Sequence, residues 1–183
     1  MELQSQRLKL RELSLNDVDT IHQLHSLLET DKYNTLGVPK NIDETKNLVI
    51  DWTNAQYESP RKKYVFCIED NHKDFIGLFG LNIGKPNYRN AEIWYKLHSN
   101  YWNKGYATEA VKAILHFCFT ELKLHRVEAG CATANIASIK VLEKSGMIKE
   151  GLKRKLLPIR GEWFDTFEYG ILEEDYFYYN NQD

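Results

Sequence analysis

The stretch from Leu97 to Ala110, LHSNYWNKGYATEA, has the residue types of a loop that binds an anion at the start of a helix. Gly105 and Ala107 leave the backbone accessible, and Lys104 adds a positive charge. The first N–H groups of a helix have no partner within the helix, and the helix dipole favours negative charge there. A phosphate group suits this arrangement. The alternative is an ordinary strand-to-helix turn in which the glycine only provides backbone geometry.

This loop differs from the two common nucleotide-binding loops. The G-x-x-x-x-G-K-[ST] spacing of a P-loop and the G-x-G-x-x-G of a dinucleotide-binding turn are both absent. The preceding segment, residues 90–97, follows two short apolar runs at 64–69 and 75–83. Three consecutive strands of this kind indicate an antiparallel meander. The sequence therefore predicts an anion-binding loop at the end of a meander.

The loop resembles the pyrophosphate loop of the GNAT N-acetyltransferase superfamily, Q/R-x-x-G-x-G/A, with Trp102 in the place of Gln or Arg. YWNKGYATEA is similar to the variant found in the branch that acetylates the N-terminal alanine or serine of ribosomal proteins, where an aromatic residue is usual at that position. Residues 125–151, HRVEAGCATANIASIKVLEKSGMIKEG, are similar to the second block of that branch, although Met147 replaces the usual Phe. The matching positions in this block are Asn135, Ser138, Lys144, Gly146, Glu150 and Gly151.

The resemblance implies acetyl-CoA as the acetyl donor, held in a gap between two splayed strands. The pantetheine arm would pair with the strand edge near Leu97 and His98, and Asn135 would hydrogen-bond the cofactor or brace the neighbouring strand. Ser138 and Lys144 complete the set of cofactor contacts. A free backbone N–H of residues 90–97 would stabilise the oxyanion. The pyrophosphate would lie on the backbone amides of Asn103, Lys104, Gly105, Tyr106, Ala107 and Thr108.

Ser138 is the first candidate for the group that meets the departing CoA thiolate. Many members of the superfamily use a tyrosine seven residues after the asparagine of the second block, and Leu142 occupies that position here. In the ribosomal branch the serine of N-x-x-S is thought to take this role, which the resemblance maps onto Ser138. The alternative is a serine that only caps or packs in the first turn of a helix.

Glu92 is the first candidate for the general base. The alternation of NAEIWYKL (90–97) places it opposite the apolar side chains, at the A-E-I-x-Y position that recurs in the family. A base helps because only a neutral amine attacks, and reference pKa values are about 10.4 for lysine and about 7.7–8.0 for an α-amine. The glutamate that some members of the branch carry after the E-G pair is missing, with leucines at 156–157. Glu92 could instead be solvated or ion-paired, and Asp165 or Glu162 could line the amine site.

The expected reaction is direct attack of a primary amine on acetyl-CoA in a ternary complex. The N-terminal amine of a ribosomal-type protein is the first acceptor to consider. A small amine such as an antibiotic, a polyamine or an amino acid is the alternative. A third reading, from another class, is a non-catalytic acyl-CoA-binding module that keeps Gly105 and Asn135 but does not turn over.

Periodicity along the chain predicts the elements that position these residues. Apolar residues recur at three- and four-residue steps in the helical segments, whereas strands alternate with period two. An S-x-x-D signal at Ser14 and a second signal at Asn41 each start a helix, and Pro60 limits the second one. The predicted strands are 7–13, 64–69, 75–83, 90–97, 126–132, 147–156 and 164–172. The helix after Ser14 is predicted over 15–29, and two further helices over 105–122 and 135–144.

These elements and the resemblance together imply an α/β (α+β) fold of the GNAT type. We expect a mixed, mostly antiparallel central sheet of about seven strands, splayed between strands 4 and 5 and flanked by about four helices. The chain shows no linker, repeat or low-complexity segment, so we expect a single N-acetyltransferase domain over residues 1–183, with a core at about 7–173.

Composition limits the partners. The 183 residues carry 24 Lys plus Arg against 26 Asp plus Glu, a net charge of −2, which does not favour nucleic acid or an anionic membrane as a partner. Cys67, Cys118 and Cys131 stand among apolar residues without metal-ligand spacing, so we expect buried thiols, no metal site and a reducing, cytoplasmic location. No signal peptide or membrane-spanning run is visible. Homodimers are common in the resembled branch, but no residue pattern here addresses the oligomeric state.

Overall fold

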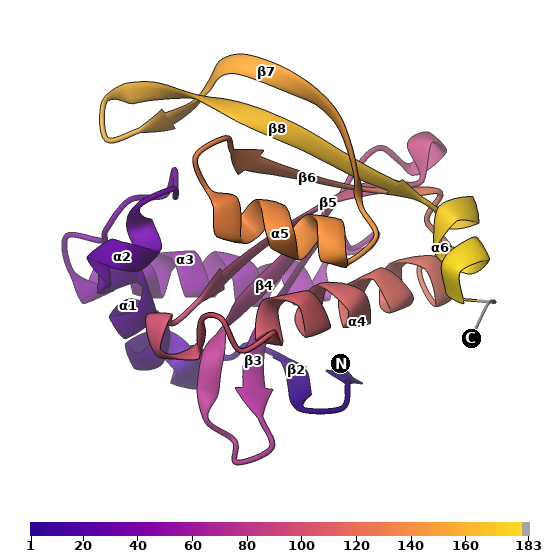
Figure 1. Cartoon of the computed structure of the whole chain (residues 1–183). Coiled ribbons are helices and arrows are strands. Elements are labelled where there is room, and N and C mark those ends of the chain that lie inside the picture. The colour runs from indigo at the N-terminus through magenta and orange to yellow at the C-terminus, as the bar shows by residue number, and fades with distance from the viewer. Residues whose placement is uncertain (181–183) are drawn as a thin grey trace.

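The computed structural model describes residues 1–180, so the last three residues of the predicted domain lie outside the described part. Its central element is an eight-stranded sheet with the order β1-β2-β3-β4-β5-β6-β8-β7 (Figure 1). All neighbouring strands pair antiparallel except β5 and β6, which are parallel. The strands are β1 Glu2–Gln4, β2 Leu8–Glu12, β3 Lys63–Asp70, β4 Phe75–Ile83, β5 Asn90–Leu97, β6 Arg126–Ala132, β7 Ile148–Ile159 and β8 Glu162–Leu172.

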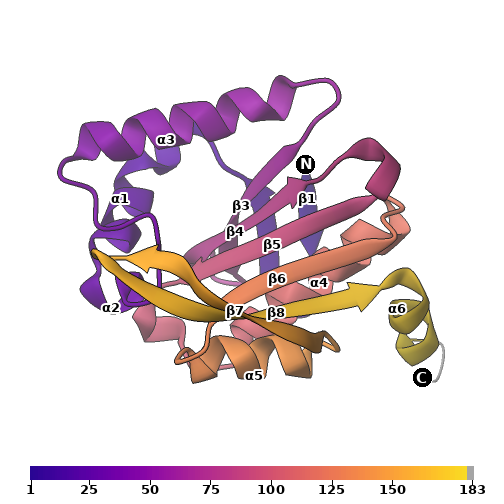
Figure 2. The same cartoon turned by 90° about the horizontal axis from the view of Figure 1, so that it is seen from above.

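Helices cover both faces of the sheet. Figures 1 and 2 show α1 and α3 on one face and α4 and α5 on the other. No helix of the described residues has both the length and the apolar character needed to cross a bilayer. The helices are α1 Val18–Ser26, α2 Leu28–Asp31, α3 Ile42–Asn54, α4 Tyr106–Thr120, α5 Ile136–Lys144 and α6 Glu173–Asn180.

Two hydrophobic clusters hold these layers together. The larger one lies between the sheet and α4 and contains the fully buried rings of Phe66, Phe79 and Phe117. The smaller one lies beneath α1 and α3, around Leu24 and Trp52. Burial of side chains of this size contributes about 1.5–3 kcal/mol each. The three cysteines are free and buried, as their apolar neighbours predicted.

The sheet opens between β5 and β6. Their parallel pairing covers three residue pairs, of which Glu92 with Glu128 is the last, while β5 continues to Leu97 and β6 to Ala132. The predicted splay is therefore confirmed. It falls between the fifth and sixth strands rather than the fourth and fifth, because the short strand β1 adds one to the count.

The sequence placed most elements correctly. The bounds of β4, β5 and β6 agree with the predicted strands, and the helices after Asn41, Gly105 and Asn135 are all present. Two short elements were not predicted, β1 at the edge of the sheet and α6 after β8. The hairpin between β7 and β8 turns at Arg160 and Gly161, later than the predicted end of the strand at 156, because irregular pairing between Lys153 and Leu157 lets β7 continue to Ile159.

The prediction of one helix over 15–29 was wrong. The segment forms a 3-10 turn, then α1, and breaks at Leu27, whose backbone is extended (φ −75°, ψ 115°), before the single turn of α2. The Thr30 hydroxyl donates to the carbonyls of Leu24 and Leu27 at 3.0 and 2.9 Å, in addition to the backbone N–H groups that both carbonyls accept. This break turns α2 towards the tip of the β7–β8 hairpin.

Candidate active site

The predicted anion-binding loop lies at the start of α4. Gly105 occupies the N-cap position with φ +81°, and no side chain caps the helix there. Asn103 also has a positive φ, +59°, so the loop turns sharply before the helix. The N–H groups of the first turn, from Tyr106 to Thr108, therefore have no side-chain acceptor at the helix start. This geometry fits a pyrophosphate group, which accepts hydrogen bonds and carries negative charge.

An ion pair that the sequence did not reveal braces this loop. Glu109, in the first turn of α4, accepts from the Arg7 backbone N–H and from Arg7 Nε, both at 2.7 Å. Arg7 Nη1 also donates to the Lys104 carbonyl at 3.1 Å, and the guanidinium lies 4.6 Å from the centre of the Tyr106 ring. The start of β2 is thereby tied to the loop. No spacing in the sequence links residues 7 and 109, so only the fold brings them together.

Trp102 stands at the head of the loop, where the family motif usually has Gln or Arg. Its indole N–H donates to the Leu97 carbonyl at 2.9 Å, which closes the turn between β5 and the loop. The N–H of His98 donates to the Ile76 carbonyl at 2.8 Å, and the His98 ring accepts from the Asn100 N–H. The Leu97 carbonyl and the His98 N–H, which lie at the strand edge predicted to pair with pantetheine, therefore both form hydrogen bonds within the protein. The β5 edge that β6 leaves free lies between Ile93 and Leu97.

Ser138 reaches across to β5. Its hydroxyl lies 2.8 Å from the Tyr95 hydroxyl, and its backbone N–H donates to Asn135 Oδ1 at 3.2 Å. Asn135 therefore caps α5, and the serine hydroxyl is not the cap. Burial raises the pKa of the Tyr95 phenol, so the phenol stays protonated and can donate. The sequence analysis missed Tyr95, although a single hydroxyl on the apolar face of a strand is a signal that a partner is required.

Two other positions of the second block have clear places. Leu142 is 1% exposed in the core, so no side chain from this position reaches the gap in the role of the superfamily's tyrosine. Lys144 is exposed in the last turn of α5, at the end opposite Asn135. The cofactor contact assigned to Lys144 stays a prediction.

Glu92 lies where the two strands part. Desolvation raises the pKa of its carboxyl, and the negative charges of Glu168 and Glu128 raise it further. Its partner on the neighbouring strand β4 is Asn82. A carboxyl whose pKa is raised in this way is suited to accept a proton from an amine.

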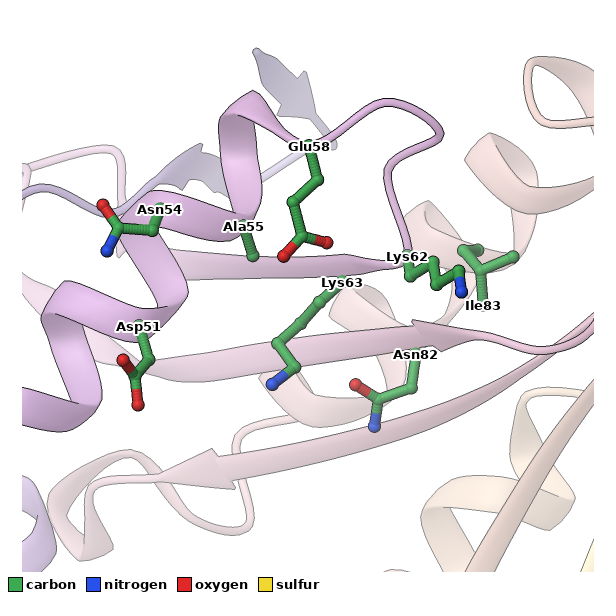
Figure 3. A pocket seen from close by; sticks show the side chains of 8 residues that line it. All are labelled: Asp51, Asn54, Ala55, Glu58, Lys62, Lys63, Asn82 and Ile83. Atoms are coloured by element: carbon green, nitrogen blue, oxygen red, sulfur yellow. The ribbon is translucent and has the colours of Figure 1, made fainter.

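A hollow of about 530 Å³ lies between α3 and the strands β3 and β4 (Figure 3). Asn82 on its wall is the strand partner of Glu92 on β5. Opposite charges line it, the carboxylates of Asp51 and Glu58 and the ammonium groups of Lys62 and Lys63. The hollow therefore opens to the same face of the sheet as Glu92.

The alternative bases lie on the hairpin. Asp165 Oδ1 accepts from the Lys155 N–H at 2.8 Å and so stabilises the irregular part of the hairpin. Glu162 is exposed at the start of β8. Neither shares the position of Glu92 at the point where the strands part.

Comparison with known proteins identifies the family. The model of the acetyltransferase (GNAT) domain matches residues 7–148. The uncharacterized N-acetyltransferase YnaD of Bacillus subtilis is 34% identical over 178 residues, covering 96% of this chain and 99% of that protein. YdaF of the same organism, which carries the provisional name of a ribosomal N-acetyltransferase, is 33% identical over 140 residues, 75% of this chain and 74% of its own.

A solved structure supports the same conclusion. Spermidine N-acetyltransferase from Vibrio cholerae, in complex with CoA and spermine, superposes with a TM-score of 0.83 at 26% identity, covering 94% of this chain and 99% of that one. The chain belongs to the GNAT family and is an acetyl-CoA-dependent N-acetyltransferase.

Proposed function

We propose that this enzyme transfers the acetyl group to the α-amine at the N-terminus of a protein, by direct attack in a ternary complex. The observation that carries the proposal is the Tyr95–Ser138 hydrogen bond, which joins β5 to α5 beside the open part of the sheet. A hydroxyl with a phenol behind it can hydrogen-bond or protonate a departing thiolate. The second block of the ribosomal branch places its serine at the same position.

The other steps fall to neighbouring groups. Glu92 accepts the proton that the amine loses, directly or through water. A backbone N–H on the free edge of β5 stabilises the oxyanion. The first turn of α4, with Lys104 nearby, holds the pyrophosphate of acetyl-CoA. The three cysteines are free and buried, as expected of an enzyme in a reducing compartment such as the cytoplasm.

The chemistry of the acceptor favours an α-amine. Its reference pKa of about 7.7–8.0 leaves a sizeable neutral fraction near pH 7.5, whereas a lysine-type amine at about 10.4 needs a far stronger base. Similarity to YdaF points the same way. A polyamine is the second candidate, because the structural neighbour binds spermine and because Glu92, Glu128 and Glu168 place three carboxylates together.

A thiol-release assay with acetyl-CoA tests the proposal against two acceptor panels. One panel holds short peptides with varied N-termini, and the other holds spermidine and other small primary amines. We expect the higher kcat/KM on the peptide panel. Higher values for spermidine would replace the first candidate by the second, and tight acetyl-CoA binding without turnover on either panel would favour a binding module.

Replacement of Glu92 by glutamine is expected to lower kcat/KM about 100-fold, within the usual range for a general base. The base acts only when ionised, so activity is present above its pKa and lost as the pH falls through it. Because that pKa is raised, the loss begins at a higher pH than for an ordinary glutamate. A pH profile of kcat/KM checks this: the acidic limb should become less steep in the variant, which keeps only the titration of the amine itself. Asp165→Asn serves as the control, and a limb that becomes less steep there instead would assign the base to Asp165.

A further inference from the structure

The α2 segment lies across the open end of the gap between β5 and β6. The two strands are parallel and pair only near their starts, so the gap is widest at their carboxyl ends. Ser99 follows β5, and its hydroxyl donates to Glu29 of α2 at 2.9 Å. Ala134 follows β6, and its carbonyl accepts from the hydroxyl of Tyr33, just after α2, at 3.0 Å. One short segment therefore contacts both sides of the gap.

The β7–β8 hairpin holds this segment in place. Arg160 donates to Asp31 Oδ2 at 3.0 Å, to the Asp31 carbonyl at 3.1 Å and to the Lys32 carbonyl at 2.8 Å. Asp31 is 2% exposed, so the ion pair has a buried carboxylate. Figure 2 shows the hairpin tip beside α2. The contacts that α2 makes across the gap therefore come from an element that is itself anchored.

The Tyr33 hydrogen bond lies next to the turn that leads to Ser138. Ala134 directly precedes Asn135, the N-cap of α5, and Asn135 Oδ1 accepts from the Ser138 N–H at 3.2 Å. On the other side of the turn, the Thr133 N–H donates to a carbonyl of β8 at 3.1 Å. The turn is thus held from two sides, by β8 and by the phenol that α2 supplies.

The position of this turn matters because the sheet does not fix it relative to β5. The pairing of β5 and β6 ends at Glu92, before Tyr95, so no ladder bond between these two strands sets the distance from Tyr95 to α5. The hydroxyls of Tyr95 and Ser138 nevertheless lie 2.8 Å apart. A misplacement of about 1 Å in a reacting group can cost about 100-fold in rate. The link through α2 supplies a connection across the gap that the strands lack.

We propose that Tyr33 is a positioning residue for acetyl transfer. Through the Ala134 carbonyl it holds the first turn of α5 at the distance from β5 at which the Ser138 hydroxyl meets the departing sulfur of CoA. The contact between Glu29 and Ser99 fixes the other side of the gap. This inference rests on the proposed role of Ser138. Because Tyr33 acts on the geometry of the chemical step, its loss should lower kcat and leave CoA binding and the acceptor KM unchanged.

The first test is the steady-state kinetics of Tyr33→Phe, which keeps the ring and removes only the hydroxyl. We expect kcat to fall about fivefold, the effect of one neutral hydrogen bond on a rate, with the acceptor KM and the CoA affinity within about twofold of the parent. Tyr57→Phe, at a tyrosine that is 83% exposed, is the matched control and should keep the parent's kcat. A parent-like kcat in Tyr33→Phe, in an enzyme that Ser138→Ala slows, would overturn the inference.

A double variant separates positioning from general support of the fold. If Tyr33 acts through Ser138, adding Tyr33→Phe to Ser138→Ala should lower kcat by no more than about twofold further. A contact that only stabilises the enzyme would lower kcat by the same factor in both backgrounds. That second result would overturn the inference.

Hydrogen–deuterium exchange tests the contact without turnover. In Tyr33→Phe the amides of residues 133–139 are expected to exchange at least about threefold faster than in the parent and in Tyr57→Phe, whereas those of β3 and β4 stay unchanged. Unchanged exchange at residues 133–139 would contradict the inference. Faster exchange there, with a parent-like kcat in both Tyr33→Phe and Ser138→Ala, would support the contact through which Tyr33 holds the turn and contradict only the role of Ser138 in the proposed function.

Discussion

Replacement of Ser138 by alanine is expected to lower kcat about 100-fold, the size of a typical general-acid contribution, while acetyl-CoA binding stays within a few-fold of the parent. The variant leaves the CoA thiolate without the hydroxyl that Tyr95 orients. Tyr95→Phe keeps the serine and removes only its partner, so we expect a smaller loss, about 10-fold. Because the two hydroxyls act as one unit, the double variant should be no slower than Ser138→Ala. Steady-state kinetics and calorimetry with CoA measure both quantities.

Ser145→Ala is the matched control for this series. Ser145 follows the same helix, and its hydroxyl donates to the Val141 carbonyl at 2.8 Å, away from Tyr95. Its removal should leave kcat unchanged. If Ser138→Ala retained the parent's kcat, or if Ser145→Ala lost as much, the hydroxyl of Ser138 would have no part in the departure of the thiolate.

The elements that the sequence predicted are those with long, regular patterns. The helix after Gly105 and the strands at 75–83, 90–97 and 126–132 carry enough apolar residues at one period to define themselves. The break at Leu27 was missed because residues 15–29 contain neither Gly nor Pro, and the extended backbone of Leu27 shows only in the fold. Tertiary contacts decided the elements that periodicity could not.

The residues of the site show the same difference between local patterns and tertiary contacts. Gly105 and Ser138 were predicted because a local motif carries each of them. Tyr95 meets Ser138 only because β5 lies beside α5 across the open sheet, and Arg7 meets Glu109 across a separation of 102 residues. Tyr33 belongs to no motif, and it meets the turn before α5 only because α2 lies at the end of the open sheet. Residues whose role comes from a contact between distant segments cannot be recognised from spacing.

Replacement of Gly105 by valine is expected to weaken CoA binding about 100-fold, which corresponds to about 2.7 kcal/mol. Two effects add. A β-branched residue at φ +81° is strained, and an added side chain would stand among the N–H groups that receive the pyrophosphate. A Cβ at this position would also lie 3.4 Å from Arg7 Nη2, the residue that braces the loop. Titration calorimetry with CoA measures the loss.

Gly161→Val separates strain from binding. Gly161 has φ +82°, nearly the value of Gly105, and a Cβ there would meet no atom within 4 Å. Both variants should therefore lose similar thermal stability through the left-handed backbone, at a cost of about 1–2 kcal/mol. Only Gly105→Val should lose affinity for CoA, because Gly161 lies in the hairpin turn and not at the start of α4. Equal affinities in the two variants would show that the pyrophosphate does not bind on the amides of this loop, and the cofactor site would have to lie elsewhere along the open edge of β5.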